Sequence, residues 1–143
     1  MRLLELDMRP FTAPVEDILF CVEAAGEASS LDGWYVEFAR EILSHFASFA
    51  EGEIAPIDEI GDQQGCRLEN GRVRMPDGFG AVYDSWREQG WPGLTAPEEY
   101  GGQGLGPLTL ALTSEVFSGA CQALQMVTAL VPGAVRTLMR FGT

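Results

Sequence analysis

The spacing of apolar side chains in the first third of the chain predicts two helices. Apolar residues recur every three or four positions over residues 11–22, which indicates a short first helix. Asp32 stands where an N-cap of the second helix is expected, and that helix fades near Ile54 and stops by Pro56. Its predicted inner stripe is Tyr35, Phe38, Ile42, Phe46 and Phe49, and its predicted outer face is Glu37, Arg40, Glu41 and Ser44.

The middle of the chain changes its periodicity from helix to strand and back. Two short alternating runs, 66–69 and 72–75, flank Asn70-Gly71, and Asn-Gly in this position is a strong signal for a β-hairpin. Because no third strand accompanies these runs, we expect the hairpin to lie as an excursion on the helical body. A third helix, closed by Gly90, is then predicted from Phe79, Val82, Tyr83 and Trp86.

The last third of the chain predicts two more helices after a loop. Residues 91–106 are rich in proline and glycine, and Pro107 is well placed as the first residue of a helix that runs to Ser118. The final helix, over residues 120–141, is apolar on all sides, so we expect part of its surface to face other protein. The expected seam, exposed in a monomer and covered in a homo-oligomer, is Leu124, Val127, Leu130, Val131 and Leu138.

Length and composition agree with one globular, all-α domain that carries only this small hairpin. The chain has 143 residues, of which 46% are hydrophobic and 21% are charged. Its nine basic residues are all arginine, and the lack of lysine excludes a lysine-type phosphate loop and Schiff-base catalysis within this chain. The net charge of −12 argues against nucleic acid or an anionic membrane as a partner.

The cysteines and the N-terminus indicate a cytoplasmic protein. Cys21, Cys66 and Cys121 are odd in number and widely spaced, which fits neither a disulfide framework nor a zinc site. We therefore expect them to be reduced and mostly buried. No export-signal pattern opens the chain, and no uninterrupted apolar stretch approaches about 18 residues, so we expect no membrane span.

The residues that most resemble chemical motifs favour structural roles. Gly101–Gly106 follows a proline-bearing loop instead of a strand, which favours a turn over a phosphate site. His45 is the only histidine, and together with Glu41 it does not make a metal site. The acidic pairs Glu98-Glu99 and Asp58-Glu59 are adjacent in sequence and are expected to point apart into water. The sequence therefore predicts no catalytic, cofactor-binding or metal-ligating residue in this chain.

Several runs of the sequence resemble one enzyme family. Residues 90–105 contain the pattern P-E-x-x-G-G-x-G, which resembles a helix-joining loop in the N-terminal domain of the flavin-dependent acyl-CoA dehydrogenases. Residues 113–116 are similar to the start of the family's next helical segment, and residues 140–143 are similar to the end of the helix after it. Residues 70–79 resemble the larger subgroup that includes the methylmercaptopropionyl-CoA dehydrogenases, which carries an extra N-terminal segment.

The resemblance implies both a domain organisation and an activity. It implies an N-terminal helical bundle domain over residues 31–143, preceded by an extension over residues 1–30. The whole enzyme would remove a proton α to the thioester carbonyl of an acyl-CoA and pass the β-hydride to FAD. In the family, the flavin site and the catalytic glutamate belong to a middle β domain and a C-terminal helical domain that this chain lacks. We therefore expect this chain alone to be inactive and to bind no FAD.

The resemblance also implies a substrate pocket. In the family this domain helps to line the pocket for the acyl tail, and by position the wall residues are Gln125, Met126, Thr128, Ala129 and Pro132. Taken without the family, the soft and polar residues among them suit either ordinary packing or the wall of an apolar pocket.

Two other interpretations stay open at this point. One is a stand-alone helical interaction or dimerisation module, such as a non-catalytic subunit of a dehydrogenase. The other is a binder of a small apolar ligand between helices. A reading frame that continues past Thr143 would favour the enzyme, and a stop codon there would favour the other two.

Overall fold

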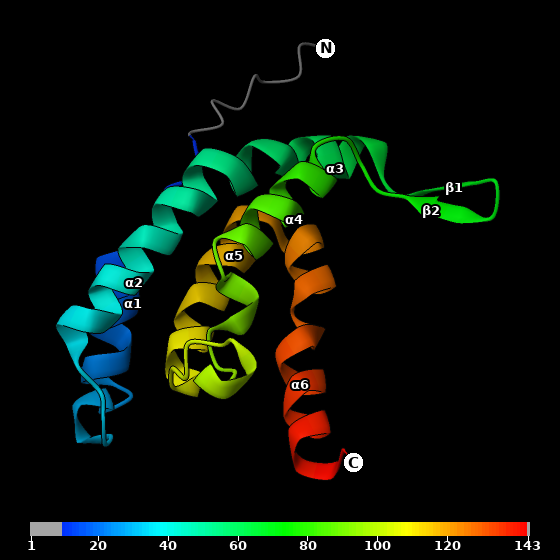
Figure 1. Ribbon diagram of the computed structural model, residues 1–143. Coiled ribbons are helices and arrows are strands. Elements are labelled where there is room, and N and C mark those ends of the chain that lie inside the picture. The colour runs from blue at the N-terminus through cyan, green and yellow to red at the C-terminus, as the bar shows by residue number, and fades with distance from the viewer. Residues whose placement is uncertain (1–9, 143) are drawn as a thin grey trace.

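The computed structural model describes residues 10–142, and it confirms a mainly helical fold with one small hairpin (Figure 1). The two strands pair antiparallel, with Leu68 opposite Val73. Short 3₁₀ turns and one π-helical turn link the longer elements. In chain order the helices and strands are α1 (Val15–Ala24), α2 (Val36–Phe49), α3 (Asp58–Gln64), β1 (Arg67–Glu69), β2 (Arg72–Arg74), α4 (Phe79–Glu88), α5 (Pro107–Thr128) and α6 (Leu130–Phe141).

The regular α-helix α2 ends at Phe49, before the predicted end near Ile54 to Pro56, but the helical path continues past Pro56. After Phe49 the chain continues as a π-helical turn over Ala50–Ile54 and a 3₁₀ turn over Ala55–Ile57, and these lead directly into α3. Figure 1 shows the resulting long rod across the top of the molecule. Pro56 is tolerated because it lies in the first turn of the 3₁₀ segment, where the missing N–H would have no helical partner.

The buried face of α2 is rotated from the predicted stripe. Tyr35 is 72% exposed and Phe38 is 50% exposed, whereas small residues of the same helix are buried. α2 packs against α1 and α5, and small side chains let the helix backbones approach closely. Asp32 caps nothing, because the helix begins at Val36 after Tyr35 and has no side-chain cap. The observed inner face is Ala39, Leu43, Phe46, Ala47 and Phe49.

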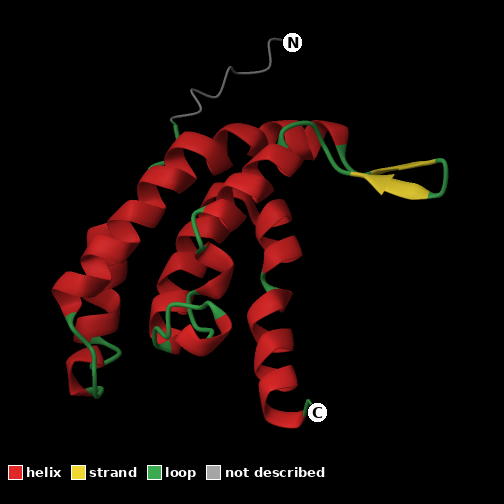
Figure 2. Cartoon of the chain, in the orientation of Figure 1, coloured by secondary structure: helices red, strands yellow, loops and turns green. Residues whose placement is uncertain are grey.

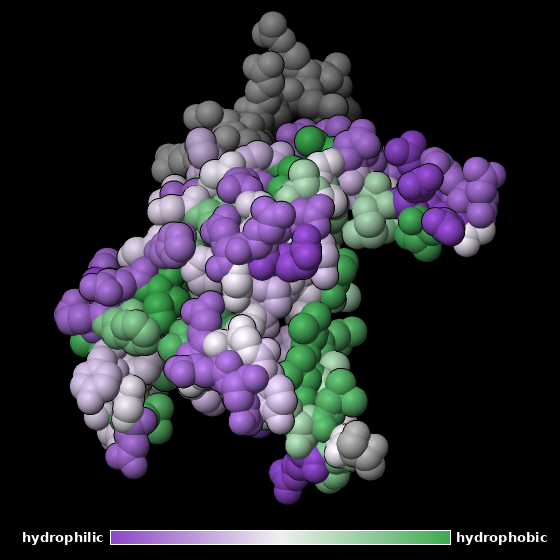
Figure 3. All heavy atoms as spheres, in the orientation of Figure 1, coloured by the Kyte–Doolittle hydropathy of each residue, from purple (hydrophilic) through white to green (hydrophobic). Residues whose placement is uncertain are grey.

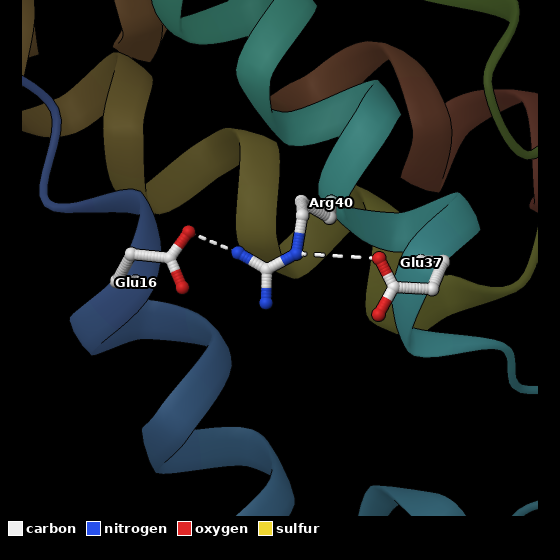
Figure 4. Close-up of polar contacts among 3 residues, drawn as sticks. All are labelled: Glu16, Glu37 and Arg40. Carbon is white, nitrogen blue, oxygen red and sulfur yellow. Dashed lines mark hydrogen bonds and ion pairs between the residues drawn. The ribbon is translucent and has the colours of Figure 1, made fainter.

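An ion pair on the surface connects α1 to α2 (Figure 4). The guanidinium of Arg40 donates a hydrogen bond to Glu16 of α1, and it lies 3.6 Å from a carboxylate oxygen of Glu37. The bond to Glu16 raises the pKa of Arg40 further above its already high ordinary value. Because these groups are exposed, we assign the pair to helix orientation and assign the stability to the apolar contacts beneath it.

Aromatic side chains from distant parts of the chain form the centre of the core. The ring of Phe46 lies edge-on to Trp91 with 4.8 Å between centroids, and it lies 5.7 Å from Phe117 of α5. Trp86 of α4 reaches the same Phe117 at 6.5 Å. This cluster joins α2, α4, α5 and the loop after α4, and Phe46 itself is only 1% exposed.

The predicted hairpin is confirmed, but it does not lie on the helical body. Asn70 and Gly71 both have positive φ, at 50° and 76°, which is the conformation that Asn-Gly favours in a two-residue turn. Every residue of β1 and β2 is exposed. Figures 1 and 2 show the hairpin projecting away from the helices beyond the end of α3.

The break between the last two helices lies later than predicted. α5 continues through Gly119 with a kink at Cys121, where φ is −161° and ψ is 95°, and the chain turns at Ala129 before α6 begins. Pro132 accounts for this position, because it lacks the N–H that would bond the carbonyl of Thr128 in a continuous helix, whereas proline is tolerated in the first turn of a new helix.

α6 stands beside the body with little cover from it. No residue of α6 is buried, and Leu130 and Leu138 are 77% and 69% exposed. Figure 3 shows the hydrophobic surface that results along this helix. Leu124 of the predicted seam is buried at 2% exposure, so its place in an exposed seam was wrong, and Val131 is half-buried. The homo-oligomer itself stays a prediction.

Pro107–Phe141 is long and apolar enough, by length and composition, to cross a membrane. The prediction required an uninterrupted run of apolar residues. The mean hydropathy of a window can still be high when the segment contains serine, threonine and glycine, as this one does. One such helix is weak support for a membrane span, because the core helix of a globular protein passes the same test. α5 buries nine of its residues in the core of this chain, and the absence of a span stays a prediction.

Candidate ligand pocket

A small cavity lies beneath the loop after α4, at the turn between α5 and α6. Its volume is about 70 Å³. The floor is aromatic and comes from α2, α4, α5 and the loop, whereas the opposite wall comes from the end of α5 and the start of α6. The lining residues that the argument uses are Phe46, Trp86, Trp91 and Phe117 on the floor and Ser114, Gln125, Thr128, Ala129 and Pro132 on the walls.

The structure brings together four of the five predicted wall residues. Gln125, Thr128, Ala129 and Pro132 all line the cavity, although the helix turn at Ala129 separates the last from the others. Met126 does not line it and is 65% exposed, because the next residue along a helix points about 100° away. Their role in substrate binding stays a prediction.

The floor of the cavity was missed at the level of sequence. Phe46, Trp86 and Phe117 were assigned to the core or left unassigned, and Trp91 was placed in a loop. The available signal was Trp91 beside Pro92 at the start of a glycine-rich loop, since a large aromatic residue there must pack against something.

The polar groups of the cavity are mostly satisfied by the helices that carry them. The hydroxyl of Thr113 donates to the carbonyl oxygens of Thr109 and Leu110 at 3.2 and 3.1 Å. The hydroxyl of Thr128 donates to the carbonyl oxygen of Gln125 at 3.0 Å. Since these hydroxyls already have hydrogen-bond partners in the protein, they do not need a polar ligand, and the cavity suits apolar atoms.

A wider groove of about 440 Å³ adjoins the cavity between α6 and the beginning of α5. Leu110, Ala129 and Pro132 line both spaces, so the groove and the cavity lie next to each other at the α5–α6 turn. Arg136 and Thr95 supply most of the polar character of the groove.

The glycine-rich loop that precedes α5 is fixed by its own backbone. The five amides of residues 101–105 each donate to a carbonyl oxygen of the segment 93–98, at distances of 2.8 to 3.0 Å. A phosphate cradle needs free amides that converge on the ligand. These amides are not free, and the loop instead holds Trp91 and Leu94 against the core.

Gly102 shows why this loop needs glycine. A Cβ atom at this position would lie 2.0 Å from the carbonyl oxygen of Ala96 and 2.6 Å from its side chain. No real Cβ atom approaches a neighbour that closely. Gly101 and Gly104 have positive φ, at 78° and 64°, which L-residues with side chains seldom adopt.

The other candidate chemical groups lie apart from the cavity. His45 is exposed, and its ring packs on Trp91 with 5.3 Å between centroids. The acidic residues of the two pairs, at positions 58, 59, 98 and 99, are all exposed. Over residues 10–142, no group of three or more His, Cys, Asp or Glu residues has a metal-binding arrangement.

The expectation that the cysteines are mostly buried was wrong. Cys21 and Cys66 are exposed, and only Cys121 is buried. Burial raises the pKa of the Cys121 thiol, so it stays protonated at neutral pH and is a poor nucleophile.

Comparison with known proteins gives two matches. The family model for the acyl-CoA dehydrogenase N-terminal domain matches residues 37–143. A protein of Ruegeria pomeroyi named 3-methylmercaptopropionyl-CoA dehydrogenase is 35% identical over 139 residues, an alignment that covers 93% of this chain. The alignment covers 24% of that relative, so the chain spans about a quarter of its length. The domain boundary predicted at residue 31 stays a prediction, and residues 1–9 of the predicted extension lie outside the described residues.

Proposed function

Because this chain belongs to the acyl-CoA dehydrogenase family and matches its N-terminal domain, we propose that it forms part of an enzyme that desaturates acyl-CoA thioesters. In that reaction a proton leaves the carbon α to the thioester carbonyl, and a hydride leaves the β carbon for an electron acceptor. We propose that other parts of the enzyme bind the two reacting carbons and supply the groups that act on them. This chain alone is therefore inactive.

We propose FAD as the acceptor of the whole enzyme, and the residues described in this chain offer it no site. The amides of the glycine-rich loop are already bonded, and the net charge of −12 of the whole chain disfavours the phosphates of a flavin dinucleotide. The contribution of this chain lies instead on the substrate side.

The role proposed for this chain is to enclose the end of the acyl group. The observation that carries the proposal is the apolar cavity at the α5–α6 turn, which gathers four residues expected at the substrate pocket and adjoins a groove. Aliphatic substrate atoms would lose contact with water there, which favours binding by about 0.8 kcal/mol per buried methylene.

The volume of the cavity limits how much of an acyl group it can enclose. Since a water molecule occupies about 30 Å³ in the liquid, a cavity of about 70 Å³ accepts roughly two or three heavy atoms. Its aromatic floor also suits a thioether, because sulfur makes favourable contacts with aromatic rings. The relative is named for a 3-methylmercaptopropionyl thioester, and we propose a short acyl group of this kind as the substrate.

The test is an activity series on the full-length protein, with acyl-CoA thioesters of increasing chain length and the 3-methylmercaptopropionyl thioester. We expect kcat/KM to be highest for short acyl groups. Ser114→Leu, which fills the cavity from α5, is expected to lower kcat/KM about tenfold or more for groups that reach the floor and to spare shorter ones.

Ser44→Leu makes the same substitution on the exposed face of α2 and serves as the control. A wild-type preference for long chains, or an equal loss on all substrates in Ser114→Leu, would contradict the pocket assignment. The absence of activity on every thioester would contradict the reaction itself.

One observation favours a second candidate function, a dimerisation module that uses α6. This helix buries none of its residues, and a set of large apolar side chains around it is exposed. Such a patch marks an interaction surface when it is contiguous. In the enzyme the same surface would be covered by the other domains, so a reading frame that stops at Thr143 would favour the module. The exposed set is Met126, Val127, Leu130, Leu138, Met139 and Phe141.

A further inference from the structure

The hairpin formed by β1 and β2, residues 67–74, is an isolated arm. All six of its strand residues are exposed, and it projects from the end of α3 (Figure 2). A two-stranded hairpin is only marginally stable in water without a surface to pack on. Nothing in the dehydrogenase reaction proposed above calls for this arm.

The arm has the opposite charge to the rest of the protein. It carries three arginines and one glutamate, whereas the whole chain has a net charge of −12. Arg67 lies directly opposite Arg74, and Glu69 lies opposite Arg72, so all four side chains share one face of the ribbon.

This basic face is not neutralised within the described part of the chain. The only ion pair on the arm there joins Arg74 to Glu69 at 3.6 Å. Two arginines directly opposite each other repel, and the arrangement becomes favourable when a negatively charged surface lies against it. The arm therefore fits an acidic partner.

A segment rich in exposed acidic residues precedes the arm in the same chain, and one of these residues, Glu51, already accepts a hydrogen bond from the backbone N–H of Ala13 at 2.9 Å. We call residues 51–62 the acidic ridge, because five of its side chains are acidic and exposed and none is basic. The arm extends away from the ridge of its own chain, and no ion pair joins the two among the described residues. The acidic residues are Glu51, Glu53, Asp58, Glu59 and Asp62.

We propose that the basic face of the arm docks on the acidic ridge of a second copy of this chain. A two-fold dimer uses the same surface on both copies, so each copy must present both complementary parts side by side. The ridge and the arm meet this requirement, since they are separated by only four residues in sequence, 63–66. The arm of each copy lies on the acidic ridge of the other copy. Charge complementarity sets where along the ridge the arm binds.

The absence of lysine from this sequence allows a direct test on the full-length protein. Arg72→Lys places an amine on the arm, and a zero-length carbodiimide reagent then joins that amine to a carboxylate in contact with it. Mixing copies with and without heavy-isotope labels identifies links between copies by mass spectrometry. We expect a peptide that joins the arm of one copy to residues 51–62 of another. Arg87→Lys, at an exposed position of α4, is the matched control and should give no such link.

A second measurement follows self-association by sedimentation. Arg72→Glu should weaken the dimer several-fold, and Arg87→Glu, which makes the same change of charge at an exposed position of α4, should not. Raising the salt concentration should weaken the wild-type dimer in the same direction. Links confined to one copy, links between copies that lie outside the ridge, or no arm link at all would overturn the proposal.

Discussion

Phe46→Ala is expected to lower the free energy of unfolding by about 3–5 kcal/mol, as for other large-to-small changes of buried aromatic residues. Phe46 is 1% exposed, and its ring contacts Trp91 of the loop and Phe117 of α5. Removing it opens a void at the point where three elements meet. Because Phe46 also lines the cavity, the void should merge with that cavity.

The measurement is urea unfolding followed by tryptophan fluorescence, with Phe20→Ala as the control. Phe20 is 71% exposed on α1, so the same truncation there should change the stability by less than about 0.5 kcal/mol. Equal losses in the two variants would show that the aromatic cluster is not the centre of the core.

Gly102→Ala is expected to destabilise the domain by about 2–3 kcal/mol, although it adds a single carbon. The added atom would meet the backbone of Ala96, which has no side-chain freedom to give way. The loop must then shift and give up hydrogen bonds such as that from Gln103 N–H to the carbonyl of Gly93, at 2.9 Å. We also expect lower affinity at the cavity, because the loop positions Trp91.

Gly80→Ala is the matched control for this prediction. Gly80 lies in α4, and a Cβ atom there has no neighbour within 4 Å. Alanine has the higher helix propensity, so this variant should be neutral or slightly more stable. A Gly102→Ala protein as stable as the wild type would mean that the loop is not tightly held.

Features set by neighbouring residues could be predicted from the sequence. Asn70-Gly71 specified the hairpin turn because few other residues adopt two successive positive φ values. Of the four residues that predicted α4, Phe79, Val82 and Trp86 are buried as expected and Tyr83 is exposed, and Pro107 correctly began α5. In each case the information lies within one turn of backbone.

Features set by distant residues were predicted less well. The burial of Ala39 and the exposure of Phe38 depend on where α1 and α5 pack against α2. The spacing of apolar residues within α2 does not contain this information. The cavity floor joins Trp86 with Phe117, from helices whose contact only the folded chain makes. Of the five wall residues expected from position within the family, four line the cavity. Met126 does not, because the direction of its side chain is set by its rotation about the helix axis.

The exposed surface of α6 was anticipated from composition. A helix that is apolar on all sides needs cover, and this chain gives α6 little. The kink at Cys121 lies two residues after the predicted break at residue 119, whereas the turn at Ala129 was not predicted as a helix boundary.

The most direct test of the account is the visible spectrum of the full-length protein during addition of a short-chain acyl-CoA thioester. We predict a flavin band that bleaches when the thioester is added, because the hydride removed from the β carbon reduces the flavin. A colourless protein, or a flavin band that no thioester bleaches, would contradict the assignment of this chain to an active acyl-CoA dehydrogenase.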